Sequence, residues 1–190
     1  MKKSILLFTL FFSLPVLAHT DHSDTFFSAF YHPFSGWDHL LTMLIIGMMA
    51  CFFPLRRAVL LPIIFVLSFS LAGIVASSFI ISSTSVQLLN QLIWISLIGL
   101  PIVHFFMTRL SAWGIFSLTG LIGGIHGFTH GVEMSFSSGT VFLGLILATT
   151  CIHIIGFGVA QLCVQKNVWI IRAFTLSSGF LGALALIQSI

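Results

Sequence analysis

The chain has 190 residues, of which 58% are hydrophobic and 6% are charged, and its formal net charge is +3. Ordinary soluble domains are about 25% charged, so this composition, with a mean hydropathy of +1.16, excludes a water-soluble globular protein. The basic residues are few and scattered, which excludes a nucleic-acid surface. We therefore predict an all-α fold, a polytopic transmembrane helical bundle in a lipid bilayer.

The first 18 residues have the three parts of a cleavable signal peptide. Lys2 and Lys3 form a positive start, the apolar run ILLFTLFF follows, and VLA supplies small residues before a cleavage site after Ala18. Cleavage there would leave His19 at the mature N-terminus. The alternative is an uncleaved first span, and we favour the signal peptide because the apolar centre is short.

Six apolar stretches follow the signal peptide, each about long enough to cross ~30 Å of hydrocarbon. The connections between them are short, so we predict one six-helix transmembrane domain over residues 19–190 and no separate soluble domain. We place the six spans near residues 37–53, 58–81, 87–107, 112–133, 140–163 and 168–188.

The basic residues predict the orientation of the bundle. A cleaved signal peptide places the mature N-terminus on the periplasmic side of the cytoplasmic (inner) membrane of a bacterium. The positive-inside bias then agrees for every Lys and Arg after the signal peptide, because all fall on the cytoplasmic side: Arg56, Arg57, Arg109, Lys166 and Arg172. Spans one to three and four to six have opposite orientations, which permits a 3+3 inverted repeat.

The stretch GGIHGFTHGVE, residues 123–133, places three ionisable groups in hydrocarbon. His126 and His130 are four residues apart and share a helix face, and Glu133 continues the same stripe. Such groups are rare inside membranes and mark functional sites, and imidazole with carboxylate suits a divalent transition metal. We predict a metal site here; the alternative is a hydrogen-bond network between helices along a glycine seam.

A second polar group lies in HPFSGWDH, residues 32–39, at the start of the first span. Because the residue before a proline avoids the α region, we expect His32 in non-helical chain that folds back over the helix start. Asp38 and His39 are about 100° apart on a helix and share no stripe. Asp38 has an alternative role in a capping box with Ser35 as N-cap. If spans one and four touch, both groups meet near the outer face and bind one metal.

Four further histidines are weaker candidates for metal ligands. His19 and His22 lie in the HTDH start of the mature chain, where an ordinary polar tail is the alternative. His104 and His153 lie within spans three and five. Each is either a later station on an ion path or a bundle residue whose hydrogen bonds are satisfied.

Other functions match fewer of these features. HGFTHGVE is not HExxH, because the carboxylate follows both histidines, so we predict that the chain is not an enzyme. The absence of GxxxxGK[ST] argues against ATP hydrolysis by this chain. The alternative that stays open is a membrane-bound haem or metal-binding protein, for electron transfer or metal sensing, without ion flux.

HPFSGWDHLLTMLIIGMMA resembles the first signature of the HupE/UreJ family of nickel and cobalt permeases, in which five residues separate a His from an Asp-His pair. GIHGFTHGVE resembles the second signature, HGxxHGxE, with Ile125 where the family often has Phe. The resemblance implies a permease for secondary uptake of Ni²⁺ or Co²⁺, for metalloenzyme or cobalamin assembly, and no cofactor beyond the transported ion. A homo-oligomer is compatible with the sequence. The functional positions implied are His32, Asp38, His39, His126, His130 and Glu133.

Overall fold

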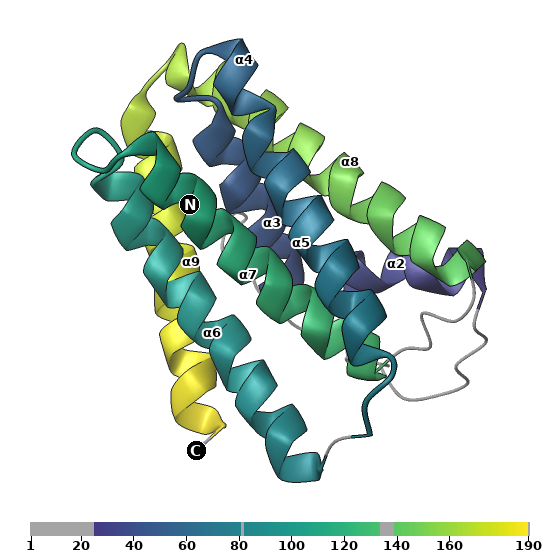
Figure 1. Ribbon diagram of the computed structural model, residues 1–190. Helices are drawn as coiled ribbons and strands as arrows, with labels where there is room; N and C mark the ends of the chain where they lie inside the picture. The colour runs from purple at the N-terminus through teal and green to yellow at the C-terminus, as the bar shows by residue number, and fades with distance from the viewer. Residues whose placement is uncertain (1–24, 81, 134–138, 190) are drawn as a thin grey trace, which may run out of the picture.

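The computed structural model describes residues 25–80, 82–133 and 139–189 (Figure 1). The predicted signal peptide and the candidate ligands His19 and His22 lie outside the described residues. Every regular element within these ranges is an α-helix: α2 (Phe26–Ser35), α3 (Trp37–Ala50), α4 (Leu55–Ala58), α5 (Leu60–Ala76), α6 (Ser83–Phe105), α7 (Ala112–Glu133), α8 (Gly139–Val164) and α9 (Val168–Gln188).

The lengths of the helices support a membrane protein. Within the described residues four helical segments are long and apolar enough to cross a bilayer: Leu55–Ala76, Ser83–Phe105, Gly139–Val164 and Val168–Gln188. Helix α3 is apolar but has only 14 residues, a length of about 21 Å at 1.5 Å per residue. Helix α7 has 22 residues, but its histidines and glycines dilute its apolar content. The chain is thus a multi-pass helical membrane protein, and the count of six spans stays a prediction.

The apolar runs predicted the helix ends most closely in the second half of the chain. Helix α7 covers the residues expected for the fourth span, and α8 and α9 lie within a residue of the fifth and sixth. The second predicted span, residues 58–81, is divided differently, because the short α4 precedes α5 and α5 ends at Ala76. Periodicity and turn residues are local signals, so they locate long regular helices well.

The prediction of non-helical chain at His32 is wrong, because His32 and Pro33 lie inside α2. A capping box starts this helix: the Thr25 hydroxyl accepts from the Ser28 backbone N–H, and the Ser28 hydroxyl accepts from the Thr25 N–H, both at 3.2 Å. Pro33 comes in the last turn, where its missing N–H removes only the bond to the Ala29 carbonyl. The cap therefore outweighs the local effect of the proline.

The chain changes direction at Gly36, between α2 and α3, where φ is −91° and ψ is 106°. Gly36 is also the N-cap of α3, without a side-chain cap, so the alternative of a capping box with Ser35 as N-cap is wrong. The Ser35 hydroxyl instead donates to the His32 carbonyl at 2.7 Å. This leaves the carboxylate of Asp38, in the first turn of α3, available for another partner.

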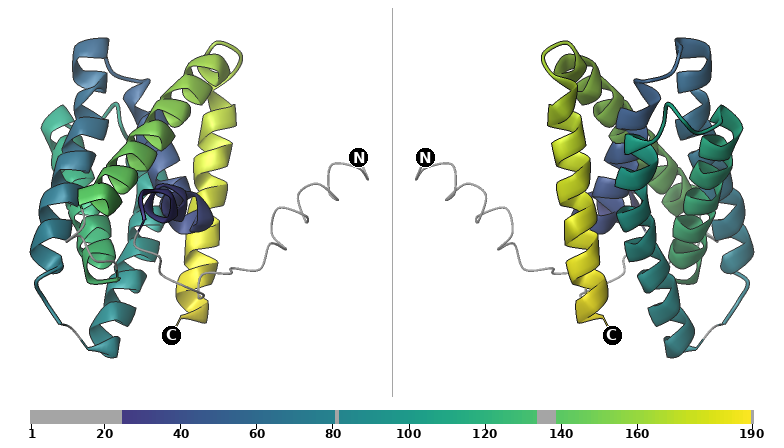
Figure 2. Two further views of the ribbon diagram at one scale, coloured as in Figure 1. Left: turned by 90° about the vertical axis from the view of Figure 1, so that its right-hand side faces the viewer. Right: turned by 90° about the vertical axis from the view of Figure 1, so that its left-hand side faces the viewer.

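Three helix pairs make the most extensive contacts, α5 with α7, α3 with α8, and α6 with α9. The short α2 lies across the bundle and packs on α8 (Figure 2). If α3, α5 and α6 form one half and α7, α8 and α9 the other, then α3 corresponds to α7, α5 to α8, and α6 to α9. The α3–α8 pair then corresponds to the α7–α5 pair, and the α6–α9 pair corresponds to itself. This is the pairing that an inverted repeat requires; the repeat itself stays a prediction.

The α5–α7 contact is a close approach of two backbones. A Cβ on Gly123 of α7 would lie 2.6 Å from the Phe65 carbonyl oxygen of α5, and a Cβ on Gly127 would collide with the carbonyl of Phe69. Glycines spaced by four residues present one side-chain-free face, which is the usual device for tight packing of membrane helices. The glycine seam expected on α7 is therefore its contact with α5.

The basic residues gather at one end of the bundle. Helix α4, the α6–α7 connection and the α8–α9 connection lie at the same end in Figure 1. Arg56 and Arg57 belong to α4, Arg109 and Lys166 to the two connections, and Arg172 to the first turns of α9. The structure thus confirms that these residues share one end, as the positive-inside argument requires.

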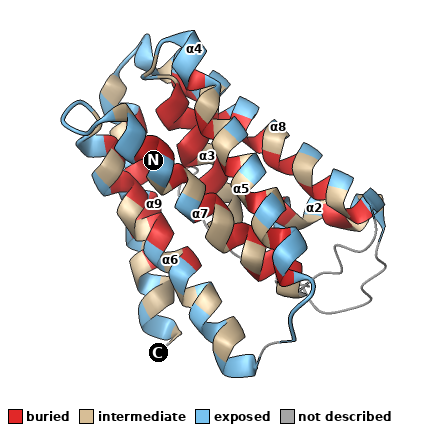
Figure 3. Ribbon diagram, in the orientation of Figure 1, coloured by how far each residue is buried: buried red, intermediate tan, exposed pale blue. Residues whose placement is uncertain are grey.

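The outward faces of the long helices are apolar. Large exposed side chains include Leu67 and Leu71 of α5 and Trp169, Phe180 and Ile187 of α9, whereas the faces turned towards neighbouring helices are buried (Figure 3). A soluble protein rarely exposes apolar surface on this scale, so these faces are suited to contact with lipid.

We expect Gly127→Ala to destabilise the bundle, because the new methyl group meets the α5 backbone at the Phe69 carbonyl. Overpacking of this kind costs about 1–3 kcal/mol. Gly124→Ala is the matched control, since a Cβ on Gly124 meets nothing within 4 Å, and both changes improve helix propensity equally. Thermal unfolding of the purified protein in detergent measures the difference. Equal midpoints for the two variants would contradict the close α5–α7 contact.

Candidate metal site

Three helices bring four imidazoles together in the interior. His32 comes from α2, His39 from the first turn of α3, and His126 and His130 from α7. The ring centres of His39 and His130 are 4.5 Å apart, those of His32 and His130 4.8 Å, and those of His39 and His126 5.2 Å. The two sequence clusters therefore meet, as expected if the first and fourth spans touch.

These separations are the ones that a shared ion would produce. Two imidazoles bound to one metal through bonds of about 2.0–2.1 Å have ring centres roughly 4.5–5.2 Å apart at bond angles of about 90–110°. Rings on opposite sides of an ion are roughly 6.3 Å apart by the same geometry, and His32 and His39 are 6.4 Å apart. The cluster has the dimensions of a polyhistidine metal site.

The spacing is not yet a coordination sphere. In the part of the chain that the structure describes, no three His, Cys, Asp or Glu side chains are arranged so that they could hold a metal ion. Glu133 is the last residue of α7, one turn after His130, but its side chain is outside the described residues. The rings must therefore turn before their nitrogens converge on one point.

Asp38 contacts His39 directly. Its Oδ1 accepts from the His39 Nδ1–H at 2.7 Å and from the His39 backbone N–H at 2.9 Å, and both side chains are at most 15% exposed. Because a carboxylate only accepts, Nδ1 carries the proton, so in the neutral form of the ring the lone pair is on Nε2. A carboxylate behind a histidine is the usual second-sphere arrangement in metal sites. Asp38 is thus placed to orient His39, a role that the sequence analysis did not consider.

The α7 imidazoles are fully buried. His126 donates Nδ1–H to the Ile122 carbonyl at 2.9 Å, so its Nε2 also keeps a lone pair, and that nitrogen has no hydrogen-bond partner among the described residues. His126 and His130 are each 0% exposed. A buried nitrogen without a partner costs about 1–3 kcal/mol, which a bound cation would offset.

Two phenylalanines of α5 contact the same rings, and the sequence analysis missed them. The Phe65 ring centre lies 5.7 Å from that of His126, and the Phe69 ring centre lies 5.7 Å from that of His130. Both phenylalanines are fully buried. The available signal was their spacing of four residues on α5, which matches the spacing of the two histidines on α7.

The two remaining candidates within the described residues lie apart from the cluster. His104 lies in the last turn of α6 and contacts Phe52. Phe52 is 13 residues after His39, or about 20 Å along the chain at the helical rise. The Nδ1 of His104 is 3.2 Å from the Thr175 hydroxyl of α9. His153 of α8 contacts Phe65, with ring centres 4.9 Å apart. Because Phe65 also contacts His126, His153 lies one side chain away from the cluster.

The comparisons with known proteins agree with these motifs. The profile of the family described as HupE / UreJ protein matches residues 6–185 of the chain. The chain is also similar to Protein HupE of Rhizobium leguminosarum bv. viciae, with 27% identity over 155 residues that cover 79% of each protein. No solved structure matches the chain.

We expect Asp38→Ala to weaken binding of a divalent transition metal more than Asp38→Asn does. The Asn oxygen still accepts from His39, whereas Ala leaves that ring without its orienting group, and loss of such a group typically costs about 10–100-fold in affinity. Equilibrium dialysis of the purified proteins with Ni²⁺ measures the affinity of each variant and so the order of the two. Ser35→Ala serves as the control, because its hydroxyl bonds only the His32 carbonyl. Wild-type affinity in both Asp38 variants would remove Asp38 from the site.

Proposed function

Because the chain belongs to the HupE/UreJ family, a family of metal-uptake proteins, we propose that it is a permease that takes up Ni²⁺ or Co²⁺ across the cytoplasmic membrane. The proposal rests on one observation above the others: four imidazoles from three helices meet inside an apolar bundle at the spacing of ligands to one ion. The family is one of transporters and not of enzymes, and the ion is the cargo.

The donor set favours a borderline transition metal over the abundant hard cations. Neutral imidazole suits nickel, cobalt, zinc and copper, whereas Mg²⁺ and Ca²⁺ require oxygen ligands. In their neutral forms His39 and His126 each carry the lone pair on Nε2, because Nδ1–H is held by an acceptor. The carboxylate of Asp38 adjoins the cluster and compensates part of the ion's charge in a low dielectric.

Capture takes place at the end of the bundle opposite the basic residues. His39 starts α3 and His130 lies in the last turn of α7, so with a periplasmic N-terminus both rings lie towards the periplasmic side. The entering ion loses water as the rings turn to meet it, and we include Glu133, three residues after His130 in sequence, as a second carboxylate of the proposed site. The four imidazoles and these two carboxylates form the outer metal site of the proposal.

Inward movement is driven by the metal gradient and the membrane potential. The potential contributes about 2.3 kcal/mol per charge per 100 mV, and so about 4.6 kcal/mol for a divalent ion. The proposed topology is the six-span bundle with both halves in opposite orientation, in which rocking of one half against the other exposes the ion to the cytoplasm. The delivered metal would serve metalloenzyme or cobalamin assembly.

Metal accumulation in cells tests the proposal. Cells that lack their own nickel uptake and express this chain should accumulate Ni²⁺ or Co²⁺, measured by mass spectrometry with Zn²⁺ and Cu²⁺ assayed in parallel. His130→Gln should lower accumulation about ten-fold or more, because loss of one ligand raises the barrier by at least ~1.4 kcal/mol. Ser178→Ala is the control, since this buried hydroxyl bonds the Phe174 carbonyl within α9.

Three measurements separate transport from its alternatives: metal accumulation in cells, metal binding by the purified protein, and an absorbance spectrum. Full accumulation in a membrane-inserted His130→Gln variant would contradict the proposed site. Metal bound by the purified protein without any accumulation in cells would indicate a metal-binding protein without flux. A Soret band in the absorbance spectrum would indicate haem.

A further inference from the structure

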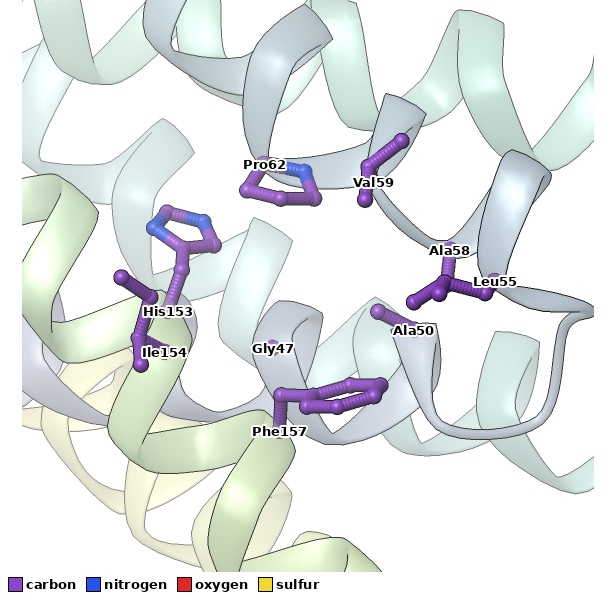
Figure 4. Close-up of a pocket in the computed structure, with 9 residues that line it drawn as sticks. All are labelled: Gly47, Ala50, Leu55, Ala58, Val59, Pro62, His153, Ile154 and Phe157. Carbon is purple, nitrogen blue, oxygen red and sulfur yellow. The ribbon is translucent and has the colours of Figure 1, made fainter.

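A cavity of about 140 Å³ lies next to His153, whose ring contacts Phe65, the same phenylalanine that contacts His126 of the outer metal site. Its walls come from α3, α4, α5 and α8 and include Gly47, Leu55 and Pro62. His153 is the one residue among those lining it whose side chain carries a hydrogen-bonding group, and its ring projects from α8 towards Pro62 (Figure 4). The cavity is otherwise apolar.

The imidazole of His153 is held in the same way as those of His39 and His126. Its Nδ1–H donates to the Thr149 carbonyl at 2.7 Å, which leaves the lone pair on Nε2. The residue is 1% exposed, and Nε2 has no hydrogen-bond partner among the described residues. Native structures retain few buried polar atoms of this kind without a functional reason.

His153 lies between the outer metal site and the basic end of the bundle. Its backbone packs against Gly47, where a Cβ would collide with the His153 carbonyl. Gly47 is eight residues after His39, or about 12 Å along α3. Beyond it the cavity reaches Leu55 of α4, the helix that carries Arg56 and Arg57. An ion that moves from the outer site to the cytoplasmic end passes the level of this ring.

Two buried hydroxyls lie along the same helix pair. Thr42 of α3 and Thr149 of α8 are both 0% exposed, and neither Oγ1 has a hydrogen-bond partner among the described residues. Thr42 is one turn after His39, and Thr149 is one turn before His153 on the helix that packs against α3. The interface between the outer site and the cavity therefore contains further oxygen donors.

From these observations we propose that His153 forms an inner metal station, at which the divalent ion released by the outer metal site binds Nε2 before it reaches the cytoplasm. The inference rests on the proposed uptake function and adds a second site to it. A single imidazole completed by water binds weakly, and a cavity of this size has room for a few waters of ~30 Å³ each. Weak binding suits a transit site, because the ion must leave again.

His104 differs from His153, because its contacts are those of a histidine with a structural role. It is also buried, but its Nδ1 bonds the Thr175 hydroxyl, which itself donates to the Arg172 carbonyl at 3.0 Å. The cavity next to it is lined by Arg172, whose positive charge repels a cation. The contrast supports His153 as the station and His104 as a link between α6 and α9.

Nickel uptake and nickel binding, measured side by side, test the station. In His153→Leu and His153→Gln we expect uptake into cells to fall about ten-fold or more, as for loss of one ligand in transit. Equilibrium binding of Ni²⁺ to the purified proteins should stay within about two-fold of wild type, because the outer metal site is intact. Ile154→Val, a neighbouring cavity residue without a ligand atom, should keep wild-type uptake.

A cysteine at the same position gives a readout that a packing role would not move. His153→Cys retains a ligand but a softer one, so uptake should be partly restored relative to His153→Leu and shift towards Cd²⁺ over Ni²⁺. Cys51, Cys151 and Cys163 are free thiols and are replaced by Ala in the parent chain for this comparison.

Three results would overturn the inner station. They are wild-type uptake in the inserted Leu and Gln variants, an unshifted metal preference in the Cys variant, and failure of all His153 variants to insert, which would assign the residue a structural role. Absence of uptake by the wild-type chain would instead refute the proposed function itself, and the station with it.

Discussion

The close contact between the α5 and α7 backbones supports everything else in the candidate site. Glycines on one face of α7 let the helix approach the carbonyls of α5, and His126 and His130 each precede one of these glycines by one residue. A rotation of about 100° per residue turns the imidazoles away from the contact and towards α2 and α3. Phe65 and Phe69 reach from α5 to the edges of the same rings. The glycine face thus determines where the histidine face points, and a side chain on that face would displace the cluster.

Three of the histidines also share a hydrogen-bonding pattern. His39, His126 and His153 each donate Nδ1–H to an oxygen one turn or less away in sequence, and so each carries the lone pair on Nε2 when its ring is neutral. In water such a ring would exchange protons and partners freely, but here burial excludes water and the held Nδ1–H selects one tautomer. The bundle thereby supplies preoriented neutral ligands, which suit a borderline metal ion and disfavour hard cations.

Side chains that could bind a metal ion are also more numerous at one end of the bundle than at the other. Several imidazoles and a carboxylate gather near the start of α3, two hydroxyls follow, and a single imidazole lines the cavity next to α4. In the proposed transport, affinity should decrease in the same direction, so the metal gradient and the membrane potential supply the free energy of the inward step, and the weaker last site releases the ion readily. The basic residues lie at the other end, which the positive-inside bias predicts to be cytoplasmic.

The sequence by itself determined the class of protein, the helices α7 to α9, the shared stripe of His126 and His130, and the basic end, because composition, periodicity and charge act through the local chain. It misjudged α2, where a cap at Thr25 stabilises a helix through Pro33. Only the tertiary structure decided that His32 meets His130, that Asp38 holds His39, and that His153 has a buried Nε2 without a hydrogen-bond partner among the described residues, whereas His104 bonds Thr175. These contacts join residues up to about a hundred positions apart, and their geometry depends on how whole helices pack, which no local pattern specifies.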